Sequence, residues 1–70
     1  MTDFTYATVL SALHEGAVRR ITLNRPDRLN AMNRALIDDV TRAFDDANTD
    51  PETRAIVLTG AGKAFCAGDD

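Results

Sequence analysis

The sequence predicts an α/β fold in which a β-hairpin is followed by a helix and one further strand. Runs rich in β-branched, aromatic and small residues occupy 5–14, 17–23 and 54–59, a composition typical of strands. Between the second and third runs, residues 34–47 place apolar side chains at helical spacing. The 70 residues form one small domain at most. Its core is marginal, because a chain this short buries only about 60% of its unfolded surface.

The first two runs read as a hairpin. Glu15-Gly16 separates them, and glycine adopts the positive φ of a tight turn at little cost. Asn24-Arg25-Pro26 ends the second run, because proline cannot donate to a strand ladder and restrains the residue before it. A polar connection over 27–33 then leads to the helix.

The predicted helix begins at Asn33 or Arg34, with Asn33 as N-cap, and ends at Ala47. Its apolar stripe consists of Leu36, Ile37, Val40, Ala43, Phe44 and Ala47. Its solvated face is expected to carry Asp38, Asp39, Arg42, Asp45 and Asp46. Asn48-Thr49-Asp50-Pro51 closes the helix.

The run at 54–59 reads as a strand buried on both faces, since it is short, apolar and bounded by proline and glycine. The helix then forms a crossover between the second strand and this one, and such crossovers are right-handed. Ligands of open α/β sheets bind outside the carboxyl ends of strands. The segment after Gly60 is therefore placed where a site is expected.

Composition excludes several classes of function. A net charge of -3 does not suit a general nucleic-acid surface, which is basic. No apolar run approaches the roughly 20 residues that span a membrane. Cys66 is the one cysteine, so no internal disulfide forms, and His14 is too far from it in sequence to suggest a zinc site. The N-terminus lacks the pattern of a signal peptide, and we expect a cytoplasmic protein.

Three short strands and one helix leave much apolar surface of a sheet unpaired. We therefore expect residues 1–70 to be the N-terminal portion of a single larger domain, whose remainder lies downstream.

Gly60-Ala61-Gly62-Lys63 does not match a phosphate-binding Walker loop, which needs four residues between the first glycine and Gly-Lys and then Ser or Thr. It reads instead as a tight turn after a strand.

Residues 65–70 read Phe-Cys-Ala-Gly-Asp-Asp and form a candidate anion or oxyanion site. Gly68 frees the backbone to present an N–H outward, and N–H groups at a turn leading into a helix bind anions. From these residues alone an ordinary loop with a helix cap is the simpler interpretation. Cys66 has no histidine near it in sequence, and we interpret it as a small buried hydrophobic residue and not as a nucleophile.

Two segments in combination resemble the crotonase (enoyl-CoA hydratase/isomerase) superfamily. Residues 21–32 resemble the family's opening, a strand that ends in Asn-Arg-Pro and leads through a basic residue into Asn-Ala-Met. The helix, the strand at 56–60 and the loop at 64–70 follow at the family's spacing. The resemblance extends over about residues 15–70 and is specific to the superfamily as a whole.

The resemblance implies the N-terminal part of a spiral of ββα units, assembled as homotrimers or hexamers. It also implies an acyl-CoA thioester substrate, with coenzyme A as part of the substrate and no separate cofactor or metal. In the family, the residue after the loop glycine donates its backbone N–H to the thioester oxygen, and that residue here is Asp69. The implied substrate-binding positions are Arg28, Asn30, Ala64, Ala67, Gly68, Asp69 and Asp70. A second donor and the acid/base groups lie beyond Asp70, so these residues alone are expected to be inactive.

Asp69 departs from the alanine frequent in hydratases, and its side chain would alter acyl preference or reaction type, or point away. The reaction expected first is hydration or isomerisation of an enoyl-CoA. One alternative is a non-catalytic fragment or pseudoenzyme of the family that binds CoA or helps oligomers to assemble. Another is a small α/β interaction domain unrelated to CoA.

Overall fold

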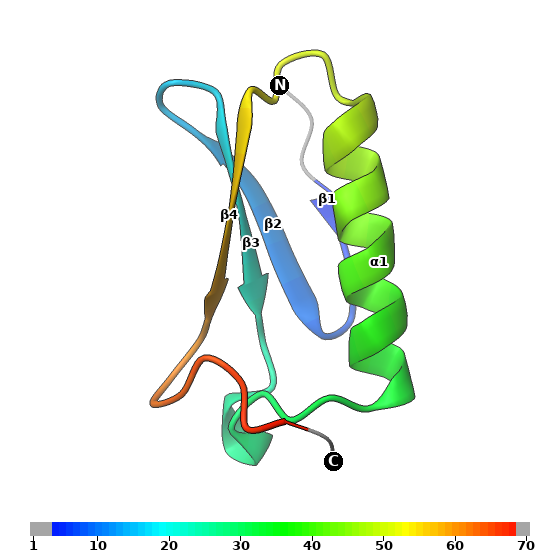
Figure 1. The fold of residues 1–70 in the computed structure, drawn as a ribbon, viewed down its shortest axis with the longest axis vertical. Coiled ribbons are helices and arrows are strands. Elements are labelled where there is room, and N and C mark those ends of the chain that lie inside the picture. Colours follow the sequence, from blue (N-terminus) through cyan, green and yellow to red (C-terminus); the bar gives the residue numbers. More distant parts are fainter. Residues whose placement is uncertain (1–3, 69–70) are drawn as a thin grey trace.

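The computed structural model describes residues 4–68, which form a four-stranded sheet with one long helix along one face (Figure 1). The elements are β1 (Phe4–Thr5), β2 (Val9–His14), β3 (Val18–Leu23), the 3-10 helix η1 (Pro26–Arg28), α1 (Arg34–Thr49) and β4 (Ala55–Gly60). The strands lie in the order β1-β2-β3-β4. β2 is antiparallel to both of its neighbours, β1 and β3, and β4 is parallel to β3. The α/β prediction is confirmed, as is the helical crossover between parallel strands.

The turn between β2 and β3 has positive φ at Gly16 (78°) and at Ala17 (61°). Glycine adopts such a φ at no steric cost, whereas it is uncommon for alanine. The carbonyl of Ala17 accepts a hydrogen bond of 2.8 Å from the N–H of Arg54, just before β4. The hairpin turn therefore also sets where β4 begins.

The single strand predicted over 5–14 is wrong, because residues 6–8 turn the chain back and β1 pairs antiparallel with β2. Tyr6 turns into the core, and its hydroxyl donates to the carboxylate of Asp46 on α1. Burial, and secondly this hydrogen bond, raise the pKa of Tyr6 above its usual value. Thr8 donates from its N–H (2.9 Å) and its hydroxyl (2.7 Å) to Asp39. These bonds hold the turn between β1 and β2 against α1.

Asn33 caps α1 as predicted, since its side-chain oxygen accepts the N–H of Leu36 at 2.9 Å. The helix continues to Thr49, two residues beyond the predicted end. Asp39, which was expected on the solvated face, is only 7% exposed. The prediction failed there because the carboxylate is the acceptor for Thr8, a partner 31 residues away in the sequence.

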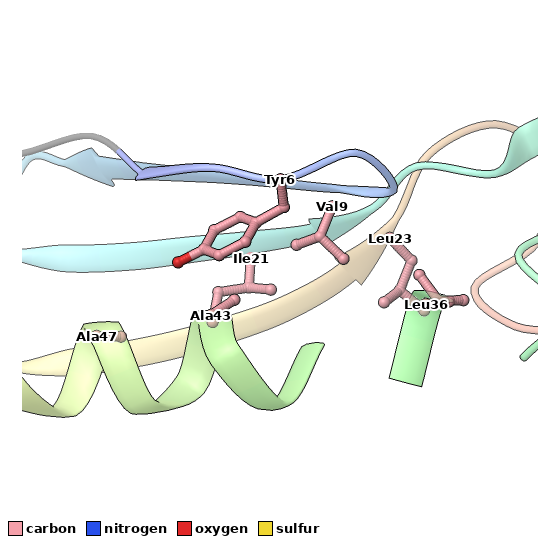
Figure 2. Packing of buried hydrophobic residues seen from close by; sticks show 7 residues of the cluster. All are labelled: Tyr6, Val9, Ile21, Leu23, Leu36, Ala43 and Ala47. Carbon is pink, nitrogen blue, oxygen red and sulfur yellow. The ribbon is translucent and has the colours of Figure 1, made fainter. Parts of the chain in front are cut away.

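The core lies between α1 and the face of β2 and β3 that the helix covers (Figure 2). Its buried members are Tyr6, Val9, Ile21, Leu23, Leu36, Ala43 and Ala47. The small side chains of Ala43 and Ala47 let the helix backbone approach the sheet, while Leu36 packs at the end where Leu23 leaves β3. The apolar stripe predicted for the helix supplies the helical side of this core, except that Ile37 is exposed.

A charged side chain is also buried on the covered face. Arg19 on β3 has no exposed surface, and its Nη2 lies 2.6 Å from the Asp50 carboxylate at the end of α1. Its Nη1 lies 3.5 Å from the hydroxyl of Ser11 on β2. Such a pair ties β3 to the end of the helix, and a buried charge keeps its ionised form only with partners of this kind.

The prediction that the last strand is buried on both faces is wrong for residues 4–68. Val57 is 47% exposed, and Leu58 is 36% exposed. The strand lies at the edge of the described sheet, and α1 packs against β2 and β3 rather than over it. β4 therefore carries more apolar surface than the other described residues cover.

No helix in the described part of the chain is long and apolar enough to cross a membrane.

Candidate functional site

The parallel strands β3 and β4 end at the same edge of the sheet, where Leu23 pairs with Gly60. Two segments leave from this edge. One passes through η1 to Met32, and the other is the loop of residues 61–68, which we call the 61–68 loop. Figure 1 shows the two segments folded against each other below the sheet. The candidate site is thus formed by segments about 35 residues apart in the sequence.

Two glycines permit the 61–68 loop to fold tightly. A Cβ atom on Gly60 would lie 2.4 Å from the carbonyl oxygen and 2.7 Å from the Cα atom of Phe65, so no side chain fits there. Gly62 has a φ of 81°, and a Cβ atom on it would lie 2.9 Å from the Cβ of Pro26. The loop therefore doubles back on the end of β4 and rests against η1.

Asn30 joins the two segments. Its side-chain Nδ2 donates to the carbonyls of Ala61 (2.9 Å) and Ala64 (2.8 Å), the two ends of the tight turn. Its Oδ1 accepts the N–H of Arg25 at 2.7 Å. Asn30 is completely buried, with a φ of 56°. Both amide hydrogens and the amide oxygen are used in these bonds.

A second connection lies at the other end of the loop. The N–H of Met32 donates to the carbonyl of Gly68 at 2.7 Å. Arg25 secures the same stretch from the other side, since its Nη1 donates to the carbonyl of Ala31. Residues 30–32 therefore hold the 61–68 loop at Ala61, Ala64 and Gly68.

Cys66 is half-buried and packs against the core. Its Sγ atom accepts a hydrogen bond of 3.4 Å from the N–H of Gly68. No histidine is near it, because His14 lies at the opposite end of β2 from the 61–68 loop. Cys66 was predicted to be a small buried hydrophobic residue; it is half-buried, and it packs against the core as such a residue does.

The structure distributes the predicted site residues between two environments. Arg28, Ala67 and Gly68 are exposed, and Ala64 is half-buried with its carbonyl bound to Asn30. Gly68 has a φ of 99°, the positive value expected of a glycine that turns the chain. Asn30 is the exception, because its buried amide faces the loop from inside. Asp69 and Asp70 lie outside the described residues.

Two features of the site were missed from sequence. The sequence assigns no role to Lys63, because the segment around it does not match a phosphate-binding loop, yet it is exposed directly after Gly62, which rests on η1. The ties made by Met32 and by the side chain of Arg25 were also missed. A main-chain donor has no sequence signature, and the one signal for Asn30 was that asparagine tolerates positive φ.

Three comparisons place this geometry among known proteins. The family model described as "Enoyl-CoA hydratase/isomerase" matches residues 14–70. The chain is 46% identical over 66 residues to a probable enoyl-CoA hydratase, echA8, of Mycobacterium tuberculosis, a match that covers 94% of this chain and 25% of that protein. It is 40% identical over 55 residues to the probable peroxisomal enoyl-CoA hydratase 1 of Arabidopsis thaliana, covering 79% and 21%. The chain thus spans about a quarter of the length of these relatives.

Solved structures agree with this result. An enoyl-CoA hydratase/isomerase from Xanthobacter autotrophicus Py2 superposes with a TM-score of 0.87 at 39% identity, over 94% of this chain and 24% of that one. The enoyl-CoA hydratase EchA8_6 from Mycobacterium marinum gives 0.85 at 44% identity, over 91% and 30%. The arrangement of strands, helix and site loop is therefore one that these enzymes share.

Proposed function

This chain belongs to the enoyl-CoA hydratase/isomerase family, and we propose on that basis that it supplies the thioester-binding loop of an enzyme acting on acyl-CoA. Its fold is the N-terminal part of a crotonase-like fold, as the sequence predicted. The reaction we propose first is hydration or isomerisation of an enoyl-CoA. The observation that carries the proposal is the 61–68 loop, held rigidly at the carboxyl ends of β3 and β4 and ending at Gly68.

The proposed chemistry is polarisation of the thioester carbonyl. When water adds to an enoyl-CoA, or when a proton leaves the carbon next to the carbonyl, negative charge develops on the thioester oxygen. A backbone N–H held in place before the reaction stabilises that charge without reorganising. We assign this role to the N–H of Asp69, which directly follows Gly68. A second donor and the acid/base groups would come from other parts of the enzyme.

The CoA moiety would lie along the exposed side of the same loop. Ala67 and Gly68 are small and exposed there, so a ligand can approach their backbone closely. Arg28 on η1 is exposed and is suited to the CoA phosphates, and Lys63 provides a second cation on the segment that rests on η1. Ala64 would contribute to CoA binding through its N–H. Asp70 would contribute through its place directly after Asp69, whose N–H is the proposed donor.

The wider properties belong to the same proposal. We propose a homotrimeric or hexameric enzyme of fatty-acid metabolism in the cytoplasm, with coenzyme A arriving as part of the substrate and no separate cofactor or metal. The oligomeric state, the metabolic role and the use of coenzyme A without a separate cofactor rest on the family resemblance. The acidic composition, with a net charge of -3, is consistent with a small-molecule substrate rather than nucleic acid.

The proposal is tested by removing the N–H of Asp69 in the full-length protein. Asp69→Pro deletes the donor, and Asp69→Ala is the matched control that keeps it. We expect Asp69→Pro to lower kcat/KM about 100- to 1,000-fold, the cost of one lost oxyanion donor. Asp69→Ala should remain within about tenfold of the parent. Equal losses in the two variants would contradict the assignment.

Substrate choice separates the reactions. A 2-enoyl-CoA reports hydration through loss of its conjugated absorbance, and a 3-enoyl-CoA reports isomerisation through the gain of that absorbance. Turnover of neither substrate, together with binding of an acyl-CoA in calorimetry, would favour a non-catalytic CoA-binding or assembly protein. The observation that favours this second candidate is that the chain spans only about a quarter of the length of its relatives. Absence of binding as well would overturn both.

A further inference from the structure

We propose that Asn30 is a positioning residue for the thioester-binding loop. Its buried amide holds the ends of the Ala61–Ala64 turn, and with the Met32 N–H it sets where Gly68, and therefore the following N–H, lies. This inference rests on the proposed function and replaces the expectation that Asn30 touches the substrate. No atom of Asn30 is exposed to a ligand, since the residue is completely buried.

Both donor hydrogens of the amide are used within the protein. Nδ2 donates both hydrogens to loop carbonyls at 2.8 and 2.9 Å, and Oδ1 accepts from Arg25 at 2.7 Å. Hydrogen bonds of this length are strong where water is excluded. Removing the amide would leave the backbone groups on both segments without a partner, which costs free energy. One side chain thus satisfies three backbone groups that lie on two segments of the chain.

The hydrogen bond between the Met32 N–H and the loop depends on the bonds that Asn30 makes. Met32 is two residues beyond Asn30, and its N–H reaches the carbonyl of Gly68 at 2.7 Å. If the amide of Asn30 were absent, the 61–68 loop would lose both ties at its beginning, and the bond between the Met32 N–H and the Gly68 carbonyl would open more often. The position of the Gly68 carbonyl would then no longer be fixed.

The backbone at Asn30 also indicates a positional role. Leu29 and Asn30 both have positive φ, 51° and 56°, which is costly for residues with side chains. Asparagine tolerates this conformation better than most residues. The N–H of Asn30 donates to the Arg25 carbonyl at 2.8 Å, which holds the turn closed. The chain thus accepts backbone strain where it directs the amide toward the loop.

Placement matters for the proposed reaction because oxyanion stabilisation depends on distance. A displacement of about 1 Å at a reacting centre costs on the order of 100-fold in rate. Asn30 would act through the carbonyls of Ala61 and Ala64, without touching the substrate.

The test compares two glycine substitutions in the full-length protein. Asn30→Gly removes the amide and keeps the positive φ, which glycine adopts freely. Leu29→Gly is the matched control, because its backbone has nearly the same φ and its side chain is 46% exposed. We expect kcat/KM for a 2-enoyl-CoA to fall at least tenfold in Asn30→Gly, mostly in kcat, and to stay within about twofold in Leu29→Gly. Both are measured well below the melting temperature.

Hydrogen exchange gives a readout that needs no turnover. The amide of Met32 should exchange at least tenfold faster in Asn30→Gly, while the amides in the middle of α1 keep the parent rates. Uniform acceleration across α1 would show a general structural role and overturn the proposal, as would a kcat/KM within twofold of the Leu29→Gly value. If Asn30→Gly does not fold, Asn30→Asp serves instead, since it keeps the shape and the acceptor for Arg25 but loses the donors to Ala61 and Ala64.

The activity of the unsubstituted protein distinguishes failure of the proposed function from failure of the role assigned to Asn30. A parent that turns over no enoyl-CoA refutes the activity, while the exchange of Met32 still tests the role of Asn30. A parent that is active, together with an equally active Asn30→Gly, refutes the positioning role alone.

Discussion

Two exposed cations, Arg28 and Lys63, stand on the two segments that Asn30 joins. Phosphate groups bind such side chains through charge-assisted hydrogen bonds, which are stronger than neutral ones. The chain as a whole has a net charge of -3, so the positive charge at this edge of the sheet would be a local feature of the surface. A CoA phosphate would be attracted to the site loop rather than to the surface at large.

Arg28→Glu should therefore raise KM for an enoyl-CoA about tenfold or more, with a smaller change in kcat, because the phosphates lie far from the reacting carbonyl. The effect should shrink at high ionic strength, since exposed charges are screened. Steady-state kinetics at low and high salt measure this. Arg54→Glu is the control, an exposed arginine next to β4 at the other end of the strand. Equal changes in KM in the two variants would show a nonspecific effect of charge.

Single residues show what sequence patterns miss. Asn30 was expected to contact the substrate and Asp39 to face solvent, yet both are buried and hydrogen-bonded to partners more than 30 residues away. Asn33 was predicted correctly because its partner, the N–H of Leu36, is three residues along the same helix. Local partners follow from spacing, whereas distant ones depend on how the elements pack.

At the scale of elements, the pair of Arg19 and Asp50 ties β3 to the end of α1. The pKa of Asp50 is lowered below its usual value, first by the N–H of Glu52 and further by the side chains of Arg19 and Thr53, although burial opposes the shift. A carboxyl group with a lower pKa in the folded state stabilises the fold above its unfolded pKa of about 4. This contribution is lost as pH falls through the lowered value.

Asp50→Asn in the full-length protein should lower the melting temperature by several degrees at pH 7, because it removes the charge opposite buried Arg19. The difference from the parent should narrow as pH falls from about 5 toward 2, where the parent loses the same charge. Thermal unfolding followed by circular dichroism across this range measures it. Asp45→Asn, an exposed carboxylate on α1, should show a much smaller difference. A constant difference at every pH would contradict the linkage.

The elements themselves were largely predictable. The helix and the strands that flank it follow from periodicity and from the glycine and proline signals, and β3, α1 and β4 lie within two residues of their predicted limits. The first strand was not, because residues 6–8 turn the chain back and Tyr6 and Thr8 hold this turn against α1. A composition that favours β structure does not show where the chain reverses when the partners of the turn lie on another element.

For the whole molecule, the described residues leave apolar surface uncovered. The large apolar side chains with at least about a third of their surface exposed include Leu10, Val57, Leu58 and Phe65. On β4 this surface belongs to a strand that reads from sequence as fully buried. Burial of this surface would stabilise the fold, at roughly 25 cal/mol for each Å² removed from water.

The 70 residues expressed alone should not turn over an enoyl-CoA above the uncatalysed rate. An oxyanion needs paired donors and the reaction needs acid/base groups, whereas the 61–68 loop carries only Lys63 and Cys66 as titratable side chains. Continuous assay at high protein concentration measures this, with the full-length protein as positive control. Turnover that follows the 70-residue chain through gel filtration would contradict the prediction.

The sequence by itself determined the family and the β–α–β arrangement around the loop, because both depend on short motifs and on spacing along the chain. The tertiary structure decided which residues hold the loop. Asn30 reaches Ala61 and Ala64, and Met32 reaches Gly68, only because the parallel pairing of β3 and β4 brings Leu23 beside Gly60. Contacts between segments more than 30 residues apart follow from the packing of the sheet and carry no periodic signal in the sequence.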